Sequence, residues 1–222
     1  MKVWGNTPRW RNGLIAVIGT LHACAPMSMM QEAHLVPKGQ DKIGMGGIAM
    51  VPLEPETRWQ PDGDLTPQAS ASQPDLQYYP IPSMIGWIRR GTGWGETQAA
   101  VSMPGLIITL ASKLGVFGKE PGSAASMSLS AEMNFAPITG SVTFGSSLFF
   151  SMQVSGGVSL DLSTRVGNYP GIWLGLGVAP TLGVTLPLAN GANLHLGAGA
   201  NFPTGEGPSP LSAWLYAGAT LP

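Results

Sequence analysis

The sequence predicts an all-β protein, an antiparallel up-and-down β-barrel that crosses a membrane. From Pro82 onward, apolar and polar residues alternate with a period of two, as in strands that have one apolar and one polar face. The polar face carries mainly Ser, Thr, Gly and Asn, and charged residues make up only 10% of the chain, fewer than a water-exposed sheet needs. After Cys24 the chain has no run of about 18 apolar residues, which excludes helical spans.

The first 23 residues are typical of a cleaved lipoprotein signal peptide. A short basic leader precedes an apolar run of about ten residues, which is long enough for a signal peptide and too short to cross a bilayer as a helix. The run ends at Cys24, the single cysteine of the chain. We expect Cys24 to be acylated, for example with palmitate, and to fix the N-terminus in the periplasm; a free cysteine in a small core is the alternative. The residues that resemble a lipobox are Leu21, His22 and Ala23.

Three further segments follow the signal peptide (1–23). Residues 24–41 form a polar tether without clear periodicity, lipidated at its first residue. The barrel is expected over 42–222, beginning with a glycine-rich strand. Residues 53–80 within it are rich in proline and acidic side chains, which predicts a long solvated loop.

The alternation predicts about ten strands. Their longest connections fall on one side and their short Gly or Asn-Gly turns on the other, an asymmetry that outer-membrane barrels share. If the chain starts in the periplasm, the long connections face outward. An eight-stranded barrel, a soluble β-sandwich and a lipocalin-like barrel on a lipid anchor are the alternatives. The expected strands are 42–52, 82–91, 95–103, 105–117, 124–135, 147–155, 158–168, 171–188, 192–203 and 210–221.

Charged and ionisable side chains on the polar faces are expected to face the lumen. Because buried charges need partners, the first interpretation is a structural ion-pair network. In a second, His195 acts with Glu132 or Asp161 as the base of an outer-membrane hydrolase, although the sequence places no nucleophile beside it. In a third, small inward residues leave a narrow pore, unless Trp173, Trp214 and Tyr216 face inward and fill it. The expected lumen residues are Arg90, Glu96, Lys113, Glu132, Asp161, Arg165 and His195.

Large aromatic side chains near the strand ends are expected on the outer face. Such rings settle at the headgroup level of a bilayer and form a girdle. The expected girdle residues are Trp87, Phe117, Phe135, Phe150 and Phe202.

The sequence contains no motif for a cofactor, a metal ion or nucleic acid. The three histidines lack zinc-site spacing, and neither a phosphate loop nor a Gly-x-Ser-x-Gly elbow is present. Lys and Arg are not clustered as nucleic-acid binding requires. We therefore expect no cofactor, no metal, no nucleic-acid partner and no enzymatic activity.

The lipobox, the short tether, the acidic loop and the run of hairpins together resemble the small lipidated outer-membrane β-barrel proteins of Gram-negative bacteria, especially deltaproteobacterial types. The resemblance covers nearly the whole chain and carries no named activity. It implies a monomer that contacts outer-membrane lipids. The chain departs from the pattern at Ala219-Thr220-Leu221-Pro222, where these barrels commonly end on an aromatic residue.

The expected function is a structural, envelope or surface-interaction role of a lipid-anchored outer-membrane barrel through its outward loops. Loop 53–80 is the expected contact for an extracellular or envelope protein. A narrow pore or small-ligand channel is the first alternative, and the hydrolase that uses His195 is the second.

Overall fold

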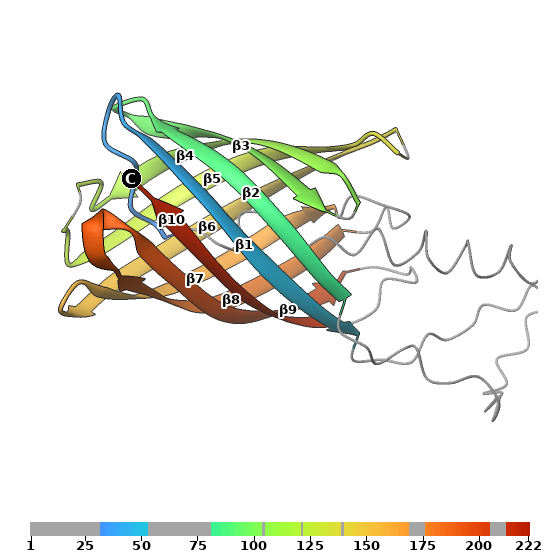
Figure 1. Cartoon of the computed structure of the whole chain (residues 1–222). Coiled ribbons are helices and arrows are strands. Elements are labelled where there is room, and N and C mark those ends of the chain that lie inside the picture. Colours follow the sequence, from blue (N-terminus) through green and yellow to red (C-terminus); the bar gives the residue numbers. More distant parts are fainter. Residues whose placement is uncertain are drawn as a thin grey trace, which may run out of the picture.

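The computed structural model is a closed barrel of ten antiparallel strands (Figure 1). It describes residues 32–52, 81–103, 105–120, 122–138, 140–168, 176–204 and 212–222. Each strand pairs with its neighbours in the sequence, and β1 pairs with β10 to close the ring. The all-β class and the count of ten strands are confirmed. The strands are β1 (Asp41–Pro52), β2 (Ile81–Gly91), β3 (Gly95–Met103), β4 (Ile107–Phe117), β5 (Ala125–Ala136), β6 (Ser141–Ser155), β7 (Val158–Asn168), β8 (Leu176–Pro187), β9 (Asn193–Pro203) and β10 (Ser212–Leu221).

One strand differs clearly from its expected bounds. β6 begins at Ser141, whereas the sequence pattern predicts a loop up to residue 146. Residues 141–146 pair with Ala136–Ala131 of β5 in unbroken register, and Val142 and Phe144 face outward there. Serine and glycine occupy the alternate positions and weaken the hydrophobic pattern, so cross-strand pairing decides this segment.

Several expectations fall outside the described residues. These are the signal peptide 1–23, acylation at Cys24 and the loop 53–80. Residues 171–175, expected at the start of a strand, also lie outside; the described part of β8 begins at Leu176. In the described part of the chain, no helix is long and apolar enough to cross a membrane.

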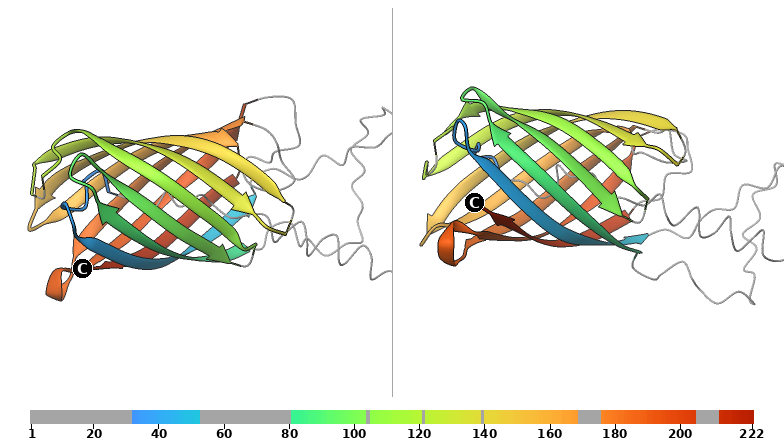
Figure 2. Two further views of the ribbon diagram at one scale, coloured as in Figure 1. Left: turned by 90° about the horizontal axis from the view of Figure 1, so that it is seen from above. Right: turned by 45° about the horizontal axis from the view of Figure 1, so that its top comes forward.

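Short turns connect the strands at the end of the barrel where β1 begins and the C-terminus lies (Figures 1 and 2). One of them is Gly156-Gly157, in which both residues have a positive φ, 58° and 79°. The β8–β9 turn contains Asn190 and Gly191, also with positive φ. Glycine and asparagine tolerate this left-handed conformation, so these positions end one strand and start the next. We call this end the short-turn end.

The two faces of the barrel have opposite chemistry. Charged side chains that face the lumen, such as Glu96, Lys113 and Arg165, are buried. The outer face instead exposes large apolar side chains on every strand, which is the reverse of a soluble protein. Examples from successive strands are Ile43, Met84, Val101, Leu110, Leu129, Leu148, Leu162, Leu182, Leu196 and Leu215.

Candidate functional site

Aromatic rings fill one side of the lumen, and we call this side the aromatic wall. It consists of Trp87 on β2 with Trp214 and Tyr216 on β10, all buried in one apolar cluster. Each ring lies over a glycine of a neighbouring strand. The space for a Cβ is taken in each case, for example at Gly199, where it would lie 2.6 Å from Trp214 Nε1. The glycines beneath the rings are Gly44, Gly183, Gly197 and Gly199.

The aromatic wall confirms one expectation and corrects another. Trp214 and Tyr216 face inward and occupy the space that the lumenal glycines leave, which is the arrangement expected to oppose an open pore. Trp87 was expected in the outer girdle, and this prediction is wrong because its side chain is only 4% exposed and packs inside. The indole ring of Trp87 lies against Gly44 on β1, which leaves room for it in the lumen because it has no side chain.

The opposite wall is lined by hydroxyl groups. β5 and β6 lie halfway round the ring from β1 and β10, and their inward residues are mostly serine and threonine. Several of these buried hydroxyls have no hydrogen-bond partner among the described residues, so bound water is their natural partner. They belong to Ser126, Ser128, Ser130, Thr143 and Ser147.

Residues 32–38 lie inside the barrel mouth at the short-turn end, and we call them the lumenal segment (Figure 2). The chain enters the mouth beside Gly91. This glycine forms an isolated β-bridge with Lys38 and backbone hydrogen bonds with Gly39 and Gln40. From there it crosses the mouth to β6, where the Ala33 amide donates to Ser151 Oγ at 2.7 Å. The tether prediction of residues 24–41 did not foresee this placement.

Backbone groups of the lumenal segment bind charged side chains of the wall. The Val36 amide donates to Glu96 Oε2 at 2.9 Å. Lys113 Nζ donates to the carbonyl of Glu32 at 3.0 Å and lies 3.4 Å from that of His34. These contacts satisfy backbone groups that have left water, which fixes an irregular segment inside the barrel.

A cluster of acidic and basic side chains holds the segment at its first residue. Glu96 pairs with Lys113 at 2.9 Å and with Arg89 at 3.6 Å. Arg89 also lies 3.8 Å from Glu32, and Lys42 lies 3.9 Å from it. Burial raises the pKa of the Glu32 carboxyl, but the nearby cations, Arg89 first, outweigh burial and leave this pKa below its ordinary value.

Glu132 and Arg165 form a separate ion pair farther along the lumen. Arg165 Nε donates to Glu132 Oε1 at 2.5 Å, and Arg165 Nη2 donates to the Asn168 carbonyl at 3.0 Å. Asn134 joins the pair by donating to the same glutamate oxygen at 3.3 Å. Gly145 leaves room for the guanidinium, because a Cβ there would collide with it. Asn134 also accepts a hydrogen bond from Thr109 Oγ1 at 2.6 Å, which extends the group to β4.

His195 belongs to a third group, a chain of hydroxyls that ends on Asp161. Thr185 Oγ1 donates to Asp161 Oδ2 at 2.5 Å and lies 2.9 Å from His195 Nδ1. On the other side of the ring, His195 Nε2 lies 2.8 Å from Thr220 Oγ1. Ser151 donates to Asp161 as well, which links this group to the lumenal segment. Such a chain can orient a histidine and pass a proton along it.

Six of the seven expected lumen residues face inward and are buried: Glu96, Lys113, Glu132, Asp161, Arg165 and His195. Ion pairs join Glu96 to Lys113 and Glu132 to Arg165, and Thr185 connects Asp161 to His195 by hydrogen bonds. The prediction that Arg90 faces the lumen is wrong, because its side chain is 67% exposed and pairs with Asp41 on the outer face. Arg89 takes the inward position. In β2 each face carries one arginine beside apolar residues, so the alternation did not show which face points inward. Trp87 and Arg90 lie on opposite faces, and one reversed assignment therefore misplaced both residues.

The other expected girdle residues keep their outward orientation. Phe117, Phe135 and Phe202 are exposed. Phe150 is half-buried and packs edge-on against Phe117, with ring centroids 6.5 Å apart.

Functional residues that sequence reasoning missed are Glu32, His34, Arg89, Thr185 and Thr220. Thr185 and Thr220 lie on the lumenal face of their strands, as Asp161 and His195 do. The alternation along each strand was therefore the signal that could have identified them. In the part of the chain that the structure describes, no three His, Cys, Asp or Glu side chains converge as a metal site.

No known family model matches this chain, and no curated protein sequence matches it.

Proposed function

We propose that this protein is a lipid-anchored outer-membrane β-barrel with a structural or surface-interaction role, whose lumen is closed by its own lumenal segment. The observation that carries the proposal is the distribution of side chains over the closed barrel. Exposed apolar residues surround the outer face, and the buried charges lie inside. A bilayer favours this arrangement and water opposes it.

A non-conducting resting state follows from the contents of the lumen. The aromatic wall occupies one side, and the lumenal segment crosses the mouth at the short-turn end. A pore that opens when this segment leaves is the second candidate function. The hydroxyl-lined wall of β5 and β6 favours it, because such a surface is compatible with a hydrated path.

A hydrolytic role has weaker support. Thr220 stands where a nucleophile would, at 2.8 Å from His195 Nε2. However, Thr220 is 2% and His195 3% exposed, so a substrate carbonyl has no route to them in this arrangement. We assign these residues a structural role and expect His195→Ala to affect barrel stability rather than lipid or peptide turnover.

The lipid anchor fits the position of the lumenal segment. Glu32 is eight positions after Cys24, which allows at most about 28 Å of extended chain. Glu32 lies near the short-turn end, so an acylated Cys24 reaches the bilayer surface there. This end is then periplasmic, and the opposite end, where β1 ends and β2 begins, faces the outside. We expect the acidic residues 53–80, which connect these two strands in the sequence, to contact a protein partner there.

The proposal is tested by purifying the mature chain. We expect it to need detergent for solubility and to migrate differently on a denaturing gel before and after boiling, as folded barrels do. In planar bilayers the folded protein should give no conductance. A mature chain that stays monomeric in buffer without detergent contradicts the membrane assignment. A wild-type protein with steady channels contradicts the closed lumen while leaving the membrane assignment intact.

The surface role requires its own variant. We expect deletion of residues 53–80 to leave heat-modifiable migration unchanged, because β1 and β2 pair directly. Loss of cell-surface binding to envelope or host material on this deletion supports the role, and unchanged binding contradicts it.

A further inference from the structure

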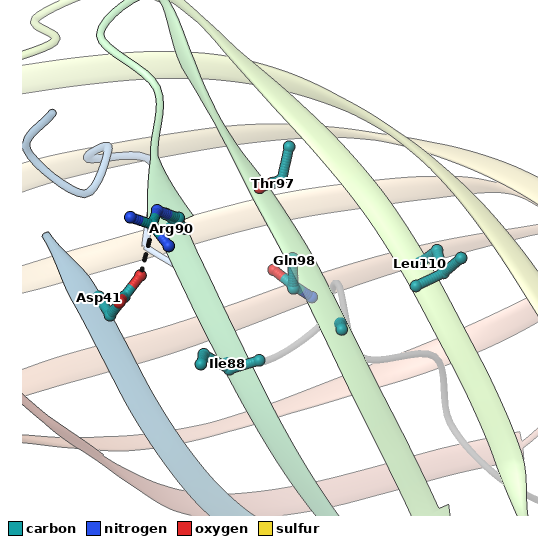
Figure 3. A pocket seen from close by; sticks show the side chains of 7 residues that line it. Asp41, Ile88, Arg90, Thr97, Gln98 and Leu110 are labelled. Carbon is teal, nitrogen blue, oxygen red and sulfur yellow. Dashed lines mark ion pairs between the residues drawn. The ribbon is translucent and has the colours of Figure 1, made fainter. Parts of the chain in front are cut away.

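The outer face of the barrel carries a pocket near the short-turn end (Figure 3). Its floor is Ala99 on β3, between Ile88 on β2 and Leu110 on β4. These three residues form one cross-strand row, since Ala99 is the register partner of both Ile88 and Leu110. A methyl group between two larger branched side chains makes a notch in the apolar outer surface.

The next row toward the barrel end is polar. There Arg90 is the register partner of Asp41 on one side and Thr97 on the other. Arg90 Nε lies 3.8 Å from Asp41 Oδ1, and the side chains are 67% and 47% exposed. Figure 3 shows both side chains beside the apolar row. At 3.8 Å the contact is an ion pair without a hydrogen bond, so both groups keep their hydrogen-bonding capacity for a ligand.

This pair is unusual for the outer face. Among the described strand residues, Asp41 and Arg90 are the only charged side chains that point outward; the other charges of the strands face the lumen. Trp94, in the turn after β2, is 62% exposed. Tryptophan and arginine near the end of a spanning element settle at the interface between apolar chains and headgroups.

We propose that Arg90, Asp41 and the Ala99 notch form a binding site for one zwitterionic phospholipid of the periplasmic leaflet. The Arg90 guanidinium binds the phosphate, Asp41 binds the primary ammonium group, and an acyl chain lies over Ala99 between Ile88 and Leu110. This inference rests on the proposed membrane function and adds a specific ligand to it.

Charge complementarity selects the headgroup. Arginine binds phosphate oxygens through a planar set of donors, and the carboxylate of Asp41 accepts from an ammonium donor. A purely anionic headgroup would meet Arg90 but be repelled by Asp41. Phosphatidylethanolamine offers both charges in one molecule, whereas phosphatidylglycerol offers only the negative one.

The experiment measures lipids that stay bound to the folded protein in native mass spectrometry. The full-length mature protein is exposed in detergent to equal amounts of phosphatidylethanolamine and phosphatidylglycerol. We expect one retained lipid, with phosphatidylethanolamine favoured by about threefold or more, the range of an exposed charge contact. Every variant must first show the heat-modifiable migration of wild type.

Three variants separate the parts of the site. Arg90→Gln should weaken retention of both lipids, and Asp41→Asn should shift the preference toward phosphatidylglycerol. Ala99→Leu fills the notch and should reduce retention to the level of unspecific adducts. Ala198→Leu is the matched control, because Ala198 is an exposed outward alanine on β9, away from the pocket.

The outcomes separate the site from the membrane assignment. A detergent-dependent, heat-modifiable barrel that retains no lipid, or shows no headgroup preference, overturns the site and leaves the proposed function standing. Equal retention by Ala99→Leu and Ala198→Leu also overturns it. A chain that is soluble without detergent overturns the membrane function and the site with it.

Discussion

The aromatic wall and the lumenal segment fill two parts of the same lumen by different physical means. Trp87, Trp214 and Tyr216 fill their side with rings that lie on glycines of neighbouring strands. The lumenal segment fills its part with backbone, held by hydrogen bonds and ion pairs to Glu96, Lys113 and other wall residues. The first is shape complementarity between strands of the barrel, and the second is docking of a segment that is not one of its strands.

The two parts of the lumen differ in what would have to break for them to move. Rings on β2 and β10 cannot leave without unpairing the barrel, because each is anchored in a strand with two partners. The lumenal segment is not one of the paired strands, so we expect that it can leave while all ten strands stay paired. A barrel with a fixed half and a displaceable half can be closed at rest and still open, and the following variants test this division.

The largest expected effect is loss of a ring from the aromatic wall. Trp214 is 1% exposed, and Trp214→Ala should lower the free energy of unfolding by about 3–5 kcal/mol through lost contacts and a cavity. Denaturant titration of the barrel in detergent measures this change. Leu215→Ala, on the same strand with the side chain outward, should cost less than half as much because detergent fills its place. An equal cost for both variants would show that the ring is not buried.

The second effect is loss of the buried carboxylate that joins wall and segment. Glu96→Gln leaves Lys113 and Arg89 with Glu32 as the remaining carboxylate, and we expect a loss of about 3 kcal/mol. The same titration measures it. The exposed pair gives the control, since Asp41→Asn should cost less than about 1 kcal/mol. A similar cost at both sites would argue against the buried cluster.

A smaller effect on stability with a larger effect on opening is expected at Gly91. A Cβ at this position would overlap the carbonyl oxygens of Val36 and Pro37. Gly91→Ala should therefore push the lumenal segment out of the mouth, with a stability loss of about 1–3 kcal/mol. Conductance should appear in planar bilayers if the lumen behind the segment is hydrated.

Gly86→Ala is the matched control for this variant. Gly86 lies on the same strand, and a Cβ there would have no neighbour within 4 Å. The control should behave as wild type. Displacement of the segment can be detected by the reactivity of a cysteine introduced at Ala33. If the segment is displaced in Gly91→Ala and no conductance appears, the aromatic wall alone closes the lumen.

The smallest effect is a pH dependence of segment docking. The pKa of Glu32 is lowered in the folded protein, so its contribution is complete above the ordinary value of 4.5 and is lost as pH falls below it through the folded pKa. Exposure of the segment to a protease should rise on acidification by at most about tenfold per pH unit, because one proton is involved. Glu32→Gln should abolish this dependence, and an unchanged acid response in that variant would assign it to another group.

The candidate site was predictable where parity along one strand was sufficient. Glu132, Asp161 and His195 each alternate with clearly apolar neighbours, so their inward orientation follows from the strand period. In β2 the period gives two similar faces. The inward orientation of Trp87 depends on Gly44 of β1, and that of Arg89 depends on its ion pair with Glu96 of β3. Contacts with residues on neighbouring strands therefore determine which face of β2 points inward.

The all-β class, the number of strands and most of the strand bounds could be predicted from the amino-acid sequence. These follow from a period of two and from glycine and asparagine at turns, which are properties of neighbouring residues. The position of residues 32–38 in the barrel mouth and the choice of partners among the lumenal charges depend on contacts that form only in the folded barrel. The physical reason is that these contacts join residues up to 118 positions apart, as Ala33 and Ser151 are, and no local pattern encodes them.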